Sequence, residues 1–186
     1  MKTFIDSNFC SVDFTLGSLI LILKKDNSEF SIIKEKFKNS ENFINVLLDF
    51  FIKHNIKIEG LDFFMLNLGP GGFVGLRNVL SSLKSISLVK KTRILGFNNF
   101  QILKTLIDNK KYDSVGIEIN NKFYVKKITD CDDYYSKFTL RSHLDINAAK
   151  IAKFSELPKY NSKNLLYILD NKLFIDNKLF PIYENK

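Results

Sequence analysis

Four of the chain's eight glycines fall between positions 69 and 75, within the segment GPGGFVGLR (69–77). The preceding run, LDFFMLNL (61–68), is almost entirely apolar and too short for a typical helix, so it predicts a buried strand. Residues 76–91 carry apolar side chains at helical spacing. The glycines are therefore expected at a strand-to-helix turn. There they permit positive φ and close backbone approach, and the free amides of the helix's first turn favour anions.

Two known phosphate-binding patterns do not fit this turn. A P-loop ends in Gly-Lys-Ser/Thr, because the lysine and the hydroxyl hold phosphates and magnesium, and neither residue is present. The dinucleotide fingerprint needs G-x-G-x-x-G spacing, which the segment lacks, and Pro70 removes one amide. The residues alone favour a tight structural turn, with anion binding as the alternative.

The turn resembles the signature G-P-G-S-F-T-G-[LV]-R of the TsaB family, also called YeaZ, the non-catalytic bacterial partner in making threonylcarbamoyl-adenosine on tRNA. Seven of the nine positions match. The residues that carry the match are Gly69, Pro70, Gly71, Phe73, Gly75, Leu76 and Arg77. Gly72 and Val74 replace the family's serine and threonine, so two hydroxyls that could bond a ligand or cap the helix are absent.

Weaker similarities extend over almost the whole chain. Asn39-Ser40-Glu41 stands where the family has His-Ser-Glu, and ILGFNNF (94–100) resembles a family strand ending in V-S-[ST]-L. EINNKFY (118–124) resembles the D-A-R-x-x-E-V-Y hairpin, and PIY (181–183) the closing P-x-Y. The resemblance is strongest in the middle and thin at both ends.

Apolar patterning predicts the element order of an actin-like ATPase half. Strands are expected at 9–15, 19–23 and 30–33, then a helix at 40–54 capped by Ser40, a strand at 61–68, a helix at 76–91, a strand at 93–96 and a helix at 99–108. This βββαβαβα order and the resemblance together predict an α/β actin-like ATPase (ribonuclease H-like) fold. The predicted first domain covers residues 1–111.

A smaller α/β domain is predicted over residues 112–186. A hairpin of 115–119 and 123–128 turns at Asn120-Asn121, which suit positive-φ positions. After a polar loop at 129–137, a short helix is expected at 146–153, and strands at 165–169 and 173–175. This helix-poor half resembles the reduced second domain of TsaB.

Composition excludes several classes of protein. With 186 residues and 45% hydrophobic content, the chain can bury a core. It has no apolar run near the about 20 residues that span a bilayer, and its first residues lack the layout of a secretory signal, so we expect a cytoplasmic protein without a membrane segment. The net charge of +8 is divided equally between residues 1–97 and 98–186. A solvated surface explains it, and a face that approaches tRNA or an acidic partner is the alternative.

The helix at 40–54 has apolar residues around most of its circumference. We expect Ile44, Leu47, Leu48 and Phe51 to face the sheet, which leaves a second apolar set. The next helix mixes apolar residues with small serines, which permit close helix approach. Either these helices pack on each other, or they contact another chain. The predicted interface residues are Phe43, Val46, Phe50, Leu76, Val79 and Leu83.

No catalytic or metal site is predicted. His54 and His143 lie in different halves without the H-x-x-x-H pair of TsaD-like relatives, and His54 is expected to cap a helix and interact with its dipole. Cys10 and Cys131 are expected to stay reduced. Actin-like ATPases use an aspartate at the end of the first strand. Asp13 is preferred over Asp6 because it needs no gap, with a structural role.

The resemblance implies a non-catalytic subunit that binds TsaD during threonylcarbamoyl transfer to the adenosine beside the anticodon. In the TsaB family the first two helices pair with the matching helices of TsaD or with a second TsaB. The family also implies an ATPase partner, TsaE, and only indirect contact with tRNA. No cofactor is expected on this chain alone, with ATP or ADP at a complex interface as an alternative. A structural role is expected for Arg77. The alternative functions are a peptidase-like hydrolase of the glycoprotease class and a homodimer of diverged function.

Overall fold

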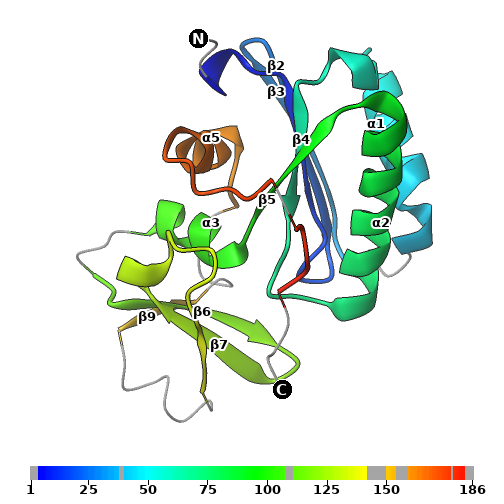
Figure 1. Ribbon diagram of the computed structural model, residues 1–186. Coiled ribbons are helices and arrows are strands. Elements are labelled where there is room, and N and C mark those ends of the chain that lie inside the picture. The colour runs from blue at the N-terminus through cyan, green and yellow to red at the C-terminus, as the bar shows by residue number, and fades with distance from the viewer. Residues whose placement is uncertain are drawn as a thin grey trace. The chain divides into compact units, whose positions relative to one another are not determined.

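The computed structural model describes residues 4–37, 40–107, 111–141, 150–153, 159–176 and 178–182 (Figure 1). The chain forms two compact units, one of residues 1–97 with 175–186 and one of residues 98–174. The predicted division after residue 111 differs from this one. Helix α3 (Asn99–Leu106) packs on α5 (Ser162–Asp170) and β6 (Ser114–Ile119) of the second unit, and the end of the chain returns to the first unit.

The first unit is built on a five-stranded sheet in the order β3-β2-β1-β4-β5. Its antiparallel part is a meander of β1 (Phe9–Asp13), β2 (Leu19–Lys25) and β3 (Ser28–Lys34). Its parallel part joins β1 to β4 (Phe63–Asn67) and β4 to β5 (Arg93–Phe97). Every residue of β1 and β4 is buried, which explains why the central strands have nearly continuous apolar sequences.

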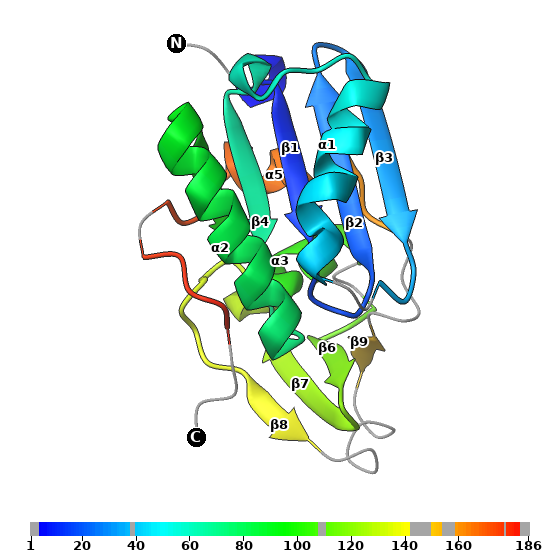
Figure 2. The same ribbon diagram turned by 90° about the vertical axis from the view of Figure 1, so that its right-hand side faces the viewer.

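Helices α1 (Phe43–Lys53) and α2 (Phe73–Lys90) lie on the same face of this sheet (Figures 1 and 2). Short 3₁₀ turns lie at Phe4–Asp6, Ser40–Asn42 and Ile58–Gly60. Because one of them precedes α1, the N-cap is Asn42, which makes no side-chain cap bond, and the predicted Ser40 cap is wrong. Ser40 Oγ instead accepts a hydrogen bond from Asn78 Nδ2 of α2 at 2.9 Å.

The second unit contains a four-stranded sheet in the order β8-β7-β6-β9. Its strands are β6, β7 (Lys122–Lys127), β8 (Thr139–Arg141) and β9 (Ile151–Lys153), and a 3₁₀ turn covers Ile128–Asp130. The predicted hairpin is confirmed, and its turn residues Asn120 and Asn121 have φ of 51° and 61°.

Three predicted elements of the second half differ from the structure. Residues 165–169 belong to helix α5 instead of a strand, with Leu165, Ile168 and Leu169 buried at helical spacing and a capping box between Asn161 and Asn164. Residues 151–153 form strand β9, parallel to β6, instead of the end of a helix, and residues 146–149 of that predicted helix lie outside the described residues. The last predicted strand, 173–175, is reduced to one bridge between Ile175 and Gly96.

The element order and the strand pairing confirm the predicted α/β class with its actin-like ATPase (ribonuclease H-like) topology. Across the described ranges, the structure contains no helix with both the length and the apolar character needed to cross a membrane.

Candidate functional site

Two polar side chains meet at the carboxyl ends of neighbouring parallel strands. Asp13 ends β1 and Asn67 ends β4. The Oδ2 atom of Asp13 accepts a hydrogen bond from Asn67 Nδ2 at 2.8 Å, and its Oδ1 accepts from Thr15 N at 2.9 Å and Thr15 Oγ1 at 2.8 Å. All three residues are buried. Asp13 is thus the first-strand aspartate, as preferred from the sequence, since Asp6 lies in a 3₁₀ turn before β1.

The glycine turn packs directly on the end of β1. Gly72 N donates to Thr15 O at 2.8 Å. A Cβ atom on Gly71 would lie 2.3 Å from that same oxygen, and one on Gly75 would lie 1.9 Å from the Phe14 ring. Close approach therefore requires glycine at both positions. At Gly72 the nearest atom to an added Cβ is 3.9 Å away, so this position has room for the serine that the family has there.

Two backbone amides of the turn donate hydrogen bonds within the protein. Gly69 has a φ of 107° and its amide donates to Asn67 Oδ1 at 3.0 Å, while the Gly72 amide donates to Thr15. Ile182 N donates to Leu68 O at 2.6 Å just before the turn. These bonds hold Gly69 and Gly72 against the ends of β4 and β1, and the anion-binding alternative, which concerns the first amides of α2, stays a prediction.

The remaining signature residues surround this network. Pro70 is buried and is joined to Gly69 by a cis peptide bond, whereas Arg77 is exposed on α2. The side chain of Phe73 lies outside the described part of the structure. A structural role for Arg77 stays a prediction.

The predicted interface residues are all in the core. Phe43, Val46, Phe50, Leu76, Val79 and Leu83 are each at most 7% exposed, so they are not available on the surface. The correction concerns which side of α1 faces the sheet: its buried residues are Phe43, Val46, Leu47, Phe50 and Phe51. Asn45, Asp49 and Lys53 are exposed at i, i+4 spacing, so this polar stripe was the available signal for the solvent side of α1.

A different set of residues forms the outward surface of the two helices. On α1, Ile44, Leu48 and Ile52 repeat every fourth residue and are 40%, 42% and 76% exposed. On α2, the exposed residues include Val74, Ser81 and Ser85. We call these six residues the outer helix face. Sequence reasoning placed Ile44 and Leu48 against the sheet, and their i, i+4 spacing was the signal for a separate ridge.

The histidine and the two cysteines have environments unlike those of reactive groups. His54 follows α1 as predicted, but its ring centre lies 4.2 Å from that of Phe30. Desolvation and the nearby Lys53 lower its pKa, which opposes the predicted charge interaction with the helix dipole. Cys10 and Cys131 are buried free thiols, and burial raises the pKa of both, that of Cys131 to about 12.

No group of three histidine, cysteine or carboxylate side chains that could hold a metal ion occurs within the described ranges. His143 and Asn39 lie outside the described residues.

Sequence reasoning missed the partners of Asp13. Thr15 and Asn67 complete the hydrogen-bonded network, and Asn67 lies 54 positions away along the chain. A polar residue inside the apolar run 61–68 was the available signal, since buried polar groups require hydrogen-bond partners.

Comparison with solved structures confirms the resemblance to YeaZ at the level of the fold. YeaZ from Pseudomonas aeruginosa superposes with a TM-score of 0.65 at 12% identity, covering 96% of this chain and all of the other. An uncharacterised protein described as similar to the peptidase YEAZ from Pseudomonas aeruginosa gives a TM-score of 0.64 at 11% identity, covering 95% of this chain and 99% of the other.

Sequence comparison identifies no family for the chain and one partial relative. No protein-family model matches the chain. The uncharacterised protein L490 of Acanthamoeba polyphaga mimivirus is 34% identical over 101 residues, which is 52% of this chain. The match spans only 19% of the length of that curated relative.

Proposed function

We propose that this chain is a non-catalytic subunit that binds TsaD and supports threonylcarbamoyl transfer to tRNA in the cytoplasm. The observation that carries the proposal is the YeaZ fold over 96% of the chain, combined with a glycine turn that keeps seven of nine signature positions. TsaD would carry the chemistry, and the contacts with TsaE, tRNA and any nucleotide would belong to the assembled complex.

The hydrogen bonds that occupy the carboxylate of Asp13, at the end of β1, support a role without catalysis. Asp13 occupies the position of the first-strand aspartate, but both of its carboxylate oxygens accept hydrogen bonds from the chain itself. The turn packs on the residue two positions beyond it, through Gly72 N and Thr15 O. A carboxylate held in this way stabilises the strand ends.

The outer helix face supports a role in binding. Ile44, Leu48 and Ile52 form an apolar ridge on α1, and Ser81 and Ser85 are exposed on the neighbouring α2. Ridges of this kind pack between the side chains of another helix, and small residues permit close approach. A helical partner that covers this face would bury apolar surface that the single chain leaves in water.

Light scattering after size-exclusion chromatography tests the proposal, with the chain alone and with TsaD from the same organism. We expect a complex of one chain with one TsaD, and its loss in Leu48→Asp. The matched control is Tyr167→Asp on α5, because Tyr167 is 41% exposed and Leu48 is 42% exposed. This control should keep the complex.

Two outcomes would refute the proposed pairing. The first is a chain that stays separate from TsaD at micromolar concentration. The second is a complex that Leu48→Asp and Tyr167→Asp leave equally intact. A homodimer that Leu48→Asp dissociates, in a chain that ignores TsaD, would assign the outer helix face to self-association instead.

A further inference from the structure

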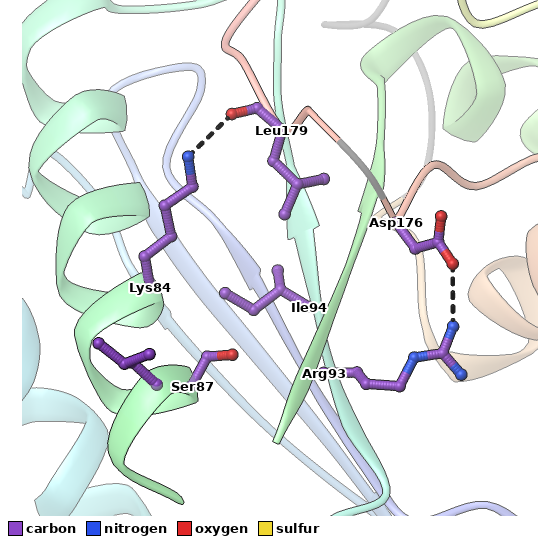
Figure 3. A pocket seen from close by; sticks show the side chains of 7 residues that line it. Lys84, Ser87, Arg93, Ile94, Asp176 and Leu179 are labelled. Atoms are coloured by element: carbon purple, nitrogen blue, oxygen red, sulfur yellow. Dashed lines mark hydrogen bonds and ion pairs between the residues drawn. The ribbon is translucent and has the colours of Figure 1, made fainter. Parts of the chain in front are cut away.

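A second surface feature of the first unit lies apart from the glycine turn. A cavity of about 370 Å³ opens between α2, β5 and a C-terminal segment of which the structure describes residues 175–176 and 178–182 (Figure 3). Its lining includes Lys84, Ser87, Arg93, Ile94, Asp176 and Leu179. Small-molecule sites in proteins usually measure about 300–1,000 Å³, so this cavity has room for a ligand of modest size.

The C-terminal segment makes one wall of the cavity and is anchored at both ends. Ile175 exchanges two backbone hydrogen bonds with Gly96 of β5, at 2.6 and 2.9 Å. Ile182 N donates to Leu68 O at 2.6 Å. The backbone of this wall is therefore hydrogen-bonded to β5 at Ile175 and to Leu68 at Ile182.

Lys84 places a positive charge at one end of the cavity. Its Nζ atom donates to the backbone oxygen of Leu179 at 3.2 Å and lies 5.7 Å from the centre of the Phe180 ring. Both partners are neutral, and within the described ranges no carboxylate forms an ion pair with Lys84. An ammonium has three donors, so Lys84 keeps both charge and donors for an anionic group.

The other end of the cavity offers a donor beside an acceptor. Arg93 Nη2 lies 3.0 Å from Asp176 Oδ2, and the two side chains are 66% and 44% exposed. Figure 3 shows Ile94 and the Leu179 side chain between this pair and Lys84. The cavity thus has a cationic end, an apolar middle and an end that both donates and accepts hydrogen bonds.

We propose that this cavity binds a guanine nucleotide unit, with its phosphate at Lys84 and its base against Ile94 and Leu179. Guanine carries acceptors at O6 and N7 and a donor at its N2 amino group. Arg93 donates to the acceptors, and Asp176 accepts from the amino group. The unit can be a free nucleotide or part of an RNA strand, since both present the same phosphate and base.

Isothermal titration of the full chain with guanosine 5′-monophosphate tests this site. We expect saturable binding that Lys84→Gln weakens about tenfold, because a charge-assisted hydrogen bond is lost. Lys90→Gln is the matched control, since Lys90 lies on the same helix, pairs with Glu59 and does not line the cavity. It should leave the affinity within about twofold, as expected for a screened surface charge.

Further probes separate the parts of the ligand. Guanosine without phosphate should bind wild type and Lys84→Gln equally, and Asp176→Asn should weaken the binding of both guanosine and the monophosphate. A guanine-containing hexaribonucleotide that binds more tightly than the monophosphate identifies RNA as the source, and equal affinity identifies the free nucleotide.

Three results would overturn the proposal. They are no saturable binding at millimolar monophosphate, binding that neither Lys84→Gln nor Asp176→Asn changes, and inorganic phosphate that binds as tightly as the nucleotide. If circular dichroism shows that Lys84→Gln is unfolded, Asp176→Asn alone decides. The binding of TsaD is measured separately, so failure of this site and failure of the proposed function are distinguishable.

Discussion

The carboxyl ends of β1 and β4 differ in character from the outer helix face of the same unit. At the strand ends, Asp13, Thr15 and Asn67 are buried and hydrogen-bonded to one another, and the glycine turn packs against them. On the outer helix face, Ile44, Leu48 and Ile52 are exposed. Polar groups at the strand ends are thus enclosed and bonded within the chain, whereas apolar side chains on the helix surface are in contact with water.

Two neighbouring leucines of α1 give the sharpest test of this difference. Leu47 is fully buried, whereas Leu48 is 42% exposed. Leu47→Asp should lower the free energy of unfolding by more than about 4 kcal/mol, because it buries an unpaired charge. Leu48→Asp should change it by at most about 0.5 kcal/mol, as at other surface positions. Urea unfolding followed by circular dichroism measures both, and equal losses would place Leu48 in the core.

The glycine turn provides a second pair of neighbours. Gly71→Ala places a Cβ atom 2.3 Å from Thr15 O, so we expect a loss of about 3 kcal/mol in the free energy of unfolding. Gly72 is the N-cap of α2, with φ −63°. Gly72→Ser should therefore be neutral or stabilising by about 0.5 kcal/mol, from capping and reduced unfolded-state entropy. If Gly71→Ala left the free energy of unfolding unchanged, the tight packing of the turn on β1 would be refuted.

The carboxylate of Asp13 is expected to contribute to stability instead of ligand binding. Asp13→Asn replaces one of the two accepting carboxylate oxygens by an NH₂ group, which is a donor. That NH₂ group would then face the donors of Thr15 or Asn67, and their hydrogen bonds would be lost. We expect a loss of about 2 kcal/mol in the free energy of unfolding, the range for hydrogen bonds to charged groups. The same urea titration measures it, and an unchanged midpoint would mean that the network is not what holds the strand ends together.

The smallest effect concerns His54, the residue that follows α1. Desolvation and Lys53 lower its pKa in the folded chain from the usual 6.5, so the unfolded state binds more protons as the pH falls through this range. Stability from this group is thus present above pH 6.5 and is lost as the pH falls through the folded pKa. An NMR titration of the His54 ring protons should show the lowered pKa. Phe30→Leu should move it toward 6.5, and a pKa above 6.5 would contradict the assignment.

Local signals in the sequence were sufficient for the first unit's elements. Gly69 to Gly75 specify a turn by their own conformational needs, and the apolar run before them identifies β4. The orientation of α1 was predicted wrongly, because the polar stripe of Asn45, Asp49 and Lys53 was not weighed against the helix's many apolar residues. Its exposed and buried residues depend on packing against the sheet.

One of the other errors had a local signal, and two further features depend on contacts between residues far apart in the chain. The apolar run at 165–169 is compatible with a strand or a helix, and the capping residue Asn161 was the signal that favours the helix. The bond between Asp13 and Asn67 and the return of Ile175 to Gly96 join residues far apart in the chain. The apolar periodicity of a short stretch of sequence contains no information about these two long-range contacts.

Reconstituted transfer to tRNA is the most direct test of a supporting role through the outer helix face. The assay combines this chain, TsaD, tRNA and threonylcarbamoyl-adenylate, adds TsaE with ATP, and measures modified adenosine. We predict transfer only when TsaD and this chain are both present, strong loss with Leu48→Asp, and normal transfer with Tyr167→Asp. Transfer by this chain without TsaD, or full activity with Leu48→Asp, would contradict that role.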